Sequence, residues 1–164
     1  IQLEEKDIIS YIYKTFINDY PKFHKMDYLS QLGFVGSEIL LQKENASRFI
    51  ERENRAIIFF NNSSSIDTDK KYYQTICDKE SFYPSPSLFV YTLPNIVTGE
   101  IALRNKYHGE SSFYILSERN EHLMKQILEV SFLDKKTTSI LCGWIDYANA
   151  ENFNAPLQIL ELEK

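Results

Sequence analysis

The sequence contains almost no cysteine and has no excess of positive charge. Cys77 and Cys142 are the only two cysteines among 164 residues, and no CxxC spacing occurs. These facts exclude a disulfide framework and a cysteine-based zinc site. The net charge is −5, without a long basic run. This argues against nucleic acid or an anionic membrane surface as a partner.

The sequence also lacks long apolar segments and targeting signals. No stretch approaches the roughly 18 apolar residues of a membrane-spanning helix, and no secretory signal pattern is visible. We therefore expect a cytoplasmic protein without a membrane span. The chain begins with Ile1 rather than Met, so a lost first element and a removed leader both stay open.

Motifs for phosphate and metal binding are absent as well. The run NNSSS (residues 61–65) has neither the glycines nor the lysine of a phosphate-binding loop, and it is typical of a plain strand-to-helix turn. Asp67, Asp69 and Asp78 are not at metal-ligand spacing. We expect no metal and no cofactor.

Aromatic residues, in contrast, are abundant. The chain has 11 Tyr and 11 Phe, and 43% of its residues are apolar. Large rings bury much surface per residue and are enriched at protein contacts. We expect one domain over residues 1–164 with a substantial core, and residues 1–20 as an extension to it.

The order of apolar segments predicts an α/β fold with a mostly parallel sheet and helices on its faces. The run AIIFF (residues 56–60) is apolar on both faces, which is typical of a strand covered on both sides. Further strands are predicted at 111–116, 138–146 and 157–163. Helices are predicted at 7–17, from Asp27 onward, and at 68–77, 94–106 and 118–132.

Individual residues mark where the predicted helices begin, end and pack. Asp27 is a candidate N-cap. Gly33 and Gly36 in the following helix indicate close approach of a neighbouring element. Pro94 suits the first turn of a helix, and Gly109 is expected to end that helix in the left-handed conformation.

Four stretches together resemble the N-terminal half of the β-ketoacyl synthases, the condensing enzymes of the thiolase fold. The most specific is PNIVTGEIALRNKYHGESSFYIL (94–116), and the others are FHKMDYLSQLGFVGSEILL (23–41), TTSILCGWID (137–146) and LQILELE (157–163). The resemblance covers about residues 22–163. It implies a thiolase-type half-domain whose last strand is antiparallel to its neighbour. Small synthase-like proteins of bacterial polyene and aryl-pigment pathways are the relatives it suggests.

The sequence departs from this family where the catalytic residues are expected. In active members the strand after the glycine turn leads into a nucleophilic Cys at a helix N-terminus, where the dipole favours the thiolate and backbone N–H groups hold the oxyanion. The matching window here is Ser117, Glu118 and Arg119, without a Cys. The family's remaining catalytic residues belong to a C-terminal half that this chain does not include.

The window also has a purely structural interpretation. Ser117 followed by Glu118 and Glu121 is a good helix start, with an N-cap oxygen and acids near the positive end of the dipole. His122 would lie one helical turn after Glu118, and it is a candidate helper residue if the window is functional. By motif, neither His122 nor His24 replaces the family's histidines.

Three other reactive residues are interpreted as structural. Cys142 is expected to be a small buried strand residue, since nothing basic flanks it. Cys77 is expected to pack on a helix face, and His108 to be a solvated turn residue.

The resemblance implies an accessory subunit without condensing activity of its own, in fatty-acid, polyketide or aryl-polyene pigment biosynthesis. Such relatives pair edge to edge with an active synthase and shape its acyl pocket. The candidate interface comprises residues 111–116 and 94–102, with Pro94, Asn95, Phe113, Tyr114 and Ile115 as its marked positions. The partner would be a second copy or a full-length ketosynthase, with acyl carrier protein as a further candidate.

Two alternatives remain open at this point. One is an enzyme, a truncated synthase that decarboxylates or hydrolyses acyl carrier protein thioesters with help from Ser117 or Glu118. The other is a module that binds a carrier protein or an acyl ligand without any partner synthase.

Overall fold

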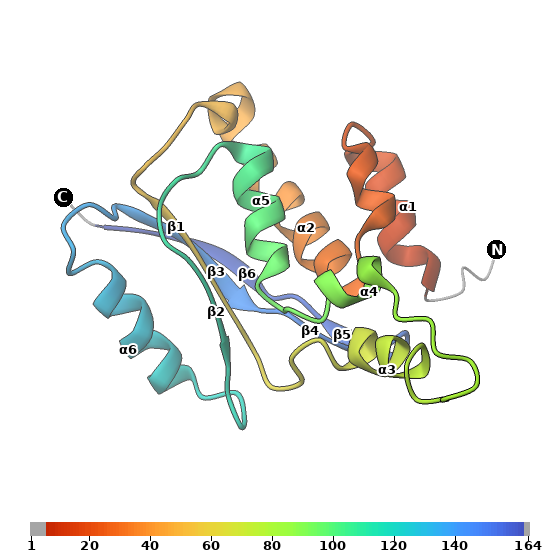
Figure 1. Cartoon of the computed structure of the whole chain (residues 1–164). Helices are drawn as coiled ribbons and strands as arrows, with labels where there is room; N and C mark the ends of the chain where they lie inside the picture. Colours follow the sequence, from red (N-terminus) through yellow and green to blue (C-terminus); the bar gives the residue numbers. More distant parts are fainter. Residues whose placement is uncertain (1–5, 163–164) are drawn as a thin grey trace.

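The computed structural model describes residues 6–162 and has a four-stranded sheet at its centre (Figure 1). Its strands are β1 (Arg55–Asn61), β2 (Ser111–Ile115), β3 (Ser139–Trp144) and β6 (Leu157–Glu161), in the spatial order β2-β1-β3-β6. β1 is parallel to β2 and β3, whereas β6 is antiparallel to β3. The four predicted strands and the mixed, mostly parallel sheet are confirmed.

Helices cover both faces of this sheet (Figure 1). One face carries α2 and α5, with α1 packed outside α2, and the other face carries α6. None of the helices within residues 6–162 is long and apolar enough to cross a bilayer. The helical elements are α1 (Lys6–Phe16), η1 (Pro21–Lys25), α2 (Tyr28–Leu41), η2 (Gln42–Phe49), α3 (Ile66–Gln74), α4 (Pro86–Val90), α5 (Ile96–Asn105) and α6 (Glu121–Ser131).

Strand β1 divides the interior into two cores. All seven of its residues are buried. Ile57 and Phe59 join the core beneath α2 and α5, whereas Ile58 and Phe60 join the core beneath α6. Because successive side chains of a strand point to opposite faces, a run that is apolar at every position needs cover on both sides.

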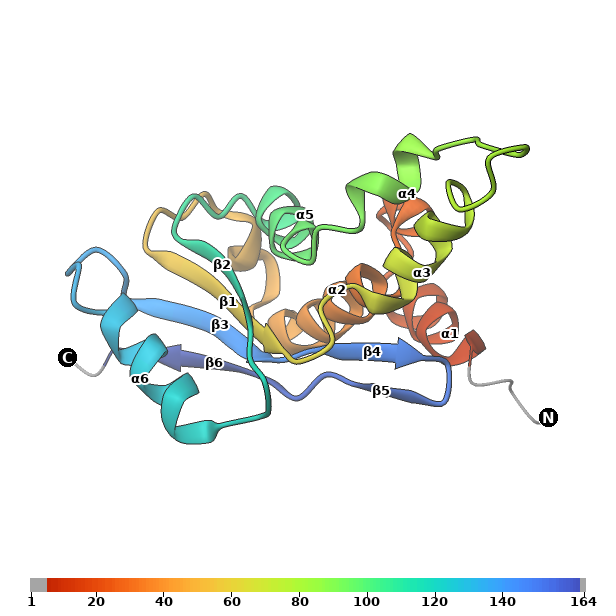
Figure 2. The same ribbon diagram turned by 60° about the horizontal axis from the view of Figure 1, so that its bottom comes forward.

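A short hairpin that the sequence did not predict extends the sheet. Strands β4 (Asp146–Asn149) and β5 (Asn152–Asn154) form a separate antiparallel pair, which continues from β3 and β6 in Figure 2. Both strands are short and contain Asn, which is depleted in strands. The tertiary position of the hairpin therefore overrides its weak local preference.

Helix α2 confirms the predictions made from its cap and its glycines. The Ser30 backbone N–H donates to Asp27 Oδ1 (3.1 Å), so Asp27 is the N-cap. A Cβ added at Gly33 would lie 2.6 Å from Cγ2 of Val97 on α5, and one at Gly36 would lie 3.0 Å from Leu157 on β6. The two glycines let α2 approach α5 and the sheet closely.

The predicted ends of α5 are wrong in detail. The helix begins at Ile96, so Pro94 precedes the first turn instead of belonging to it. The left-handed residue that ends the helix is Lys106 (φ 57°), three residues before Gly109. Gly109 is needed for a different reason: a Cβ there would lie 2.3 Å from the Arg55 carbonyl oxygen, where the chain enters β2 beside β1.

The close approach at Gly109 generates a first prediction. We expect Gly109→Ala to lower the free energy of unfolding by about 1–3 kcal/mol or more, because the backbone of β1 must shift. The matched control is Gly99→Ala within α5, where an added Cβ meets nothing within 4 Å, and a gain of about 0.5–1 kcal/mol is expected. Urea denaturation followed through Trp144, the single tryptophan, measures both. Equal stability of the two variants would contradict the packing argument.

Candidate functional site

The segment between β2 and α6 is the position at which the family resemblance places a nucleophile. β2 ends at Ile115, and the Leu116 backbone N–H donates to the Asn61 carbonyl oxygen at the end of β1 (2.8 Å). Residues 117–119 are exposed in a short non-helical connection. Helix α6 then begins at Glu121, and the Asn120 side chain accepts the Leu123 backbone N–H (3.0 Å).

This geometry corrects the predicted helix start. The N-cap is Asn120 and not Ser117, because residues 116–119 form an irregular connection with a bend at 117–118. Ser117, Glu118 and Arg119 therefore lie outside the first turn of α6, where the dipole effect is already weak. Arg119 forms an ion pair with Glu121 (2.6 Å). His122 is exposed on α6. Because α6 begins only at Glu121, Glu118 is not part of the helix, and His122 does not lie one helical turn after it.

The remaining histidines are not brought to this segment. His108 lies before β2, at the opposite end of that strand, and its Nε2 is 2.8 Å from the exposed Glu51 carboxylate. This confirms a solvated turn residue. His24 lies in η1, stacked edge-on against Tyr13 and Phe23. Within residues 6–162 no three His, Cys, Asp or Glu side chains are placed to hold a metal ion.

The two cysteines differ in environment. Cys142 is buried on β3, as predicted, and burial raises the pKa of its thiol to about 11. A thiol with so high a pKa is almost entirely protonated at neutral pH and is a poor nucleophile. Cys77 is exposed and follows the end of α3 at Gln74, so its predicted packing role is wrong.

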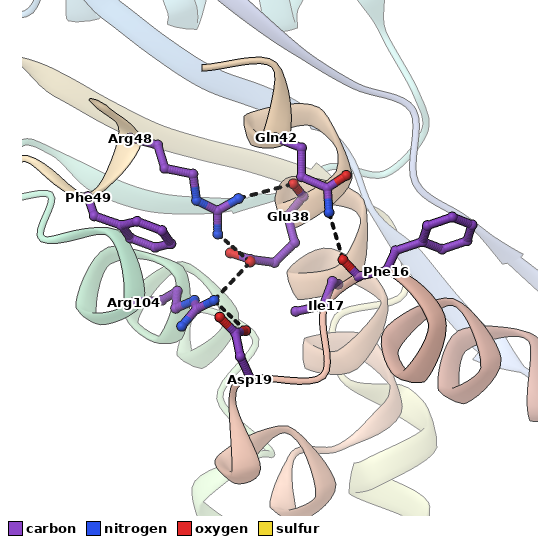
Figure 3. Close-up of a pocket in the computed structure, with 8 residues that line it drawn as sticks. All are labelled: Phe16, Ile17, Asp19, Glu38, Gln42, Arg48, Phe49 and Arg104. Carbon is purple, nitrogen blue, oxygen red and sulfur yellow. Dashed lines mark hydrogen bonds and ion pairs between the residues drawn. The ribbon is translucent and has the colours of Figure 1, made fainter. Parts of the chain in front are cut away.

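A pocket of about 250 Å³ contains a cluster of charged residues that the sequence did not reveal (Figure 3). Glu38 of α2 is its centre: Oε2 accepts from Arg48 of η2 and lies 3.5 Å from Arg104 of α5. Arg104 also pairs with Asp19 (2.5 Å). The ring of Phe49 lies against both guanidinium groups, 4.3 Å from Arg48 and 5.0 Å from Arg104.

This charged cluster joins four parts of the chain. Its two cations, Arg48 and Arg104, and its two anions, Asp19 and Glu38, neutralise one another. Glu38 and Arg48 are almost completely buried, and the cluster ties α2, η2, α5 and the chain after α1 together. Its members at positions 19, 38, 48 and 104 share no local motif, so only the folded chain brings them together.

Strand β2 has an open edge. Within the described residues it pairs only with β1. Phe113 packs against the core beneath α2 and α5, while Tyr114 stacks on Phe60 (ring centroids 5.5 Å apart) in the other core. Ile115 is 53% exposed. The strand carries no charge or proline, the usual devices that protect an edge.

Two solved structures resemble this arrangement. The ishigamide ketosynthase/chain length factor matches 85% of this chain with a TM-score of 0.68 and 18% sequence identity. A ketosynthase (ApeO) in complex with its chain length factor (ApeC) from Xenorhabdus doucetiae matches 89% of this chain with a TM-score of 0.56 and 12% identity. This chain has the ketosynthase fold.

The fold match confirms the structural side of the resemblance found in the sequence. No family model and no curated protein matches the chain. The match spans 39% of the first ketosynthase/chain length factor chain and 62% of the second, so this chain corresponds to part of each.

The buried charged cluster generates a second prediction. Glu38→Gln keeps the side-chain shape but leaves Arg48 buried beside a neutral amide. We expect a loss of about 3–5 kcal/mol in the free energy of unfolding, the usual cost of removing one partner of a buried ion pair. The control is Glu118→Gln in the exposed connection, with an expected change below about 0.5 kcal/mol. Thermal and urea denaturation measure the stability of both variants. A Glu38→Gln protein as stable as the wild type would show that folding does not depend on the charged cluster.

Proposed function

We propose that this chain is a non-catalytic, ketosynthase-like accessory subunit that pairs with a full-length ketosynthase. The observation that carries the proposal is the combination of the ketosynthase fold with a connection between β2 and α6 that contains no cysteine. The pathway would make a fatty acid, a polyketide or an aryl-polyene pigment. Both similar structures come from ketosynthase and chain length factor pairs, which supports the accessory role.

The chemistry of the connection supports a role without acyl transfer. Ser117 and Glu118 are exposed and precede the helix, so neither has the dipole and the backbone donors that activate a nucleophile at a helix N-terminus. A carboxylate has no sulfur, so Glu118 cannot carry an acyl group as a thioester. The buried Cys142 offers no substitute, since its thiol is protonated.

The open edge of β2 supports a role in pairing. An unpaired strand edge presents backbone N–H and C=O groups that a second strand can complete. Because Phe113 and Tyr114 already pack within the chain, Ile115 is the side chain of β2 best placed to contact a partner. Pro94 and Asn95, just before α5, complete the candidate interface.

A third prediction concerns covalent chemistry. After incubation with malonyl or acetyl thioesters, we expect the Cys77→Ser chain to stay unmodified, because the variant removes the one exposed thiol. Intact-protein mass spectrometry measures this, with a full-length ketosynthase as the positive control. An acyl adduct within residues 116–120, or carbon dioxide released from a malonyl carrier protein, would show that the chain is an enzyme.

A fourth prediction concerns pairing with the full-length ketosynthase encoded nearest to the gene of this chain. Ile115→Lys places a charge at the edge of β2 and should weaken the complex by about tenfold or more. Leu162→Lys is the control, since Leu162 is 50% exposed and directly follows β6, the strand at the opposite edge of the sheet. Analytical ultracentrifugation of the co-expressed proteins measures both. Failure of the wild-type chain to bind the synthase would overturn the proposal.

A further inference from the structure

Three buried polar atoms at the pocket of the charged cluster have no hydrogen-bond partner in the described part of the chain. They are one carboxylate oxygen, Glu38 Oε1, and two N–H donors, Arg48 Nε and Arg104 Nε. Figure 3 shows the three side chains converging on this pocket from α2, η2 and α5. Proteins pair nearly all buried polar groups with protein, water or a ligand. One acceptor and two donors at a single pocket therefore indicate a ligand that both donates and accepts hydrogen bonds.

The charges of the buried side chains in this pocket are not balanced among themselves. The side chains of Glu38, Arg48 and Arg104 are 3%, 6% and 13% exposed, so one buried anion faces two buried cations. The fourth member of the cluster, Asp19, balances the second cation from the surface, where its side chain is 59% exposed. Because buried charges are normally paired, the pocket is suited to one further negative charge.

Asp19 is the member of the cluster that a ligand can displace. It lies in the connection between α1 and η1 and contacts Arg104 Nη2 (2.5 Å). Exposed ion pairs add little stability, so a carboxylate from solution can take the place of Asp19 on Arg104. Arg48 is held more firmly, since it donates to both the carboxylate and the backbone carbonyl oxygen of Glu38. The three unpartnered atoms are covered in the present arrangement, so displacement of a side chain is also what gives a ligand access to them.

The size and walls of the pocket limit the ligand further. Its volume is about 250 Å³, and a cavity of about 150 Å³ is enough to hold benzene. Phe49 and Ile17 supply apolar walls, and the ring of Phe49 is 37% exposed beside the two guanidinium groups. A molecule with one ring or a short apolar chain fits this space.

We propose that this pocket binds a small 2-hydroxycarboxylic acid with an apolar side chain. The ligand's carboxylate replaces Asp19 on Arg104 and accepts from the two Nε–H groups, and its apolar side chain contacts Phe49. Its hydroxyl group donates to Glu38 Oε1. Glu38 Oε2 lies 3.5 Å from Arg104, so a carboxylate on Arg104 is close to Glu38, and a donor on the adjacent carbon can reach the free oxygen. The inference does not depend on the accessory role.

The test titrates mandelate into the full chain and follows backbone amides by NMR. We expect saturable binding with a dissociation constant of about 1 mM and shifts at Ile17 and Phe49. Phenylacetate lacks the hydroxyl group and should bind about fivefold more weakly. Mandelamide lacks the charge and should bind about tenfold more weakly or less.

Variants of the pocket give opposite expected effects. Asp19→Asn removes the carboxylate that competes for Arg104 and should strengthen mandelate binding by about threefold. Arg104→Lys keeps the charge but loses the planar donor group, and it should weaken binding by about tenfold. If Arg104→Lys does not fold, the exposed Asp19→Asn variant still provides the test. The control is Glu121→Gln, which removes the exposed partner of Arg119 and should leave binding unchanged.

Each outcome supports or overturns the inference. Saturable binding of mandelate that is stronger in Asp19→Asn and weaker for phenylacetate and mandelamide supports it. Equal affinity for mandelate and phenylacetate overturns the role of the hydroxyl group, and tighter binding of phenylglycine overturns the ligand class in favour of a zwitterion. Absence of binding to the wild type and to Asp19→Asn would mean that water satisfies the three buried atoms, and it overturns the site itself.

Discussion

Burial of β1 on both faces is the constraint on which the rest of the structure depends. Its four large apolar residues, Ile57, Ile58, Phe59 and Phe60, are almost fully buried, which contributes a gross stabilisation of about 6–12 kcal/mol. That is comparable with the whole net stability of about 5–15 kcal/mol of a typical domain. The strand can be buried in this way only if α2 and α5 cover one face and α6 covers the other.

The position of the functional features follows from this layering. With β1 and β3 inside the sheet, β2 becomes an edge, and its side chains are divided between the two cores. The covered faces leave the backbone edge, Ser111 and Ile115 as the exposed parts of β2.

Polar interactions fix the helical layer on this framework. The buried Glu38 carboxylate forms ion pairs with two arginines from different elements. The glycines of α2 let this helix lie close to α5 and β6, and this sets the position of Glu38. Buried ion pairs add little net stability, but removal of one partner is costly. The cluster therefore favours one arrangement of α2, η2 and α5 over alternatives.

The sequence by itself determined the four strands of the central sheet, the parallel core strand and the ketosynthase resemblance. These depend on local signals: the apolar run 56–60, the Asp27 cap, and the spacing from Pro94 to Gly109. The absence of a cysteine at residues 117–119 is likewise a fact of sequence alone.

Only the tertiary structure decided the exact start of α6 at Asn120, the hairpin of β4 and β5, and the charged cluster around Glu38. Two of these, the cap and the hairpin, involve local signals that were ambiguous or weak. Ser117 and Asn120 are equally good capping residues, and the course of the chain after β2 selects between them. The charged cluster depends on residues far apart in sequence, whose contacts exist only once β1 is buried and the helices are packed around it.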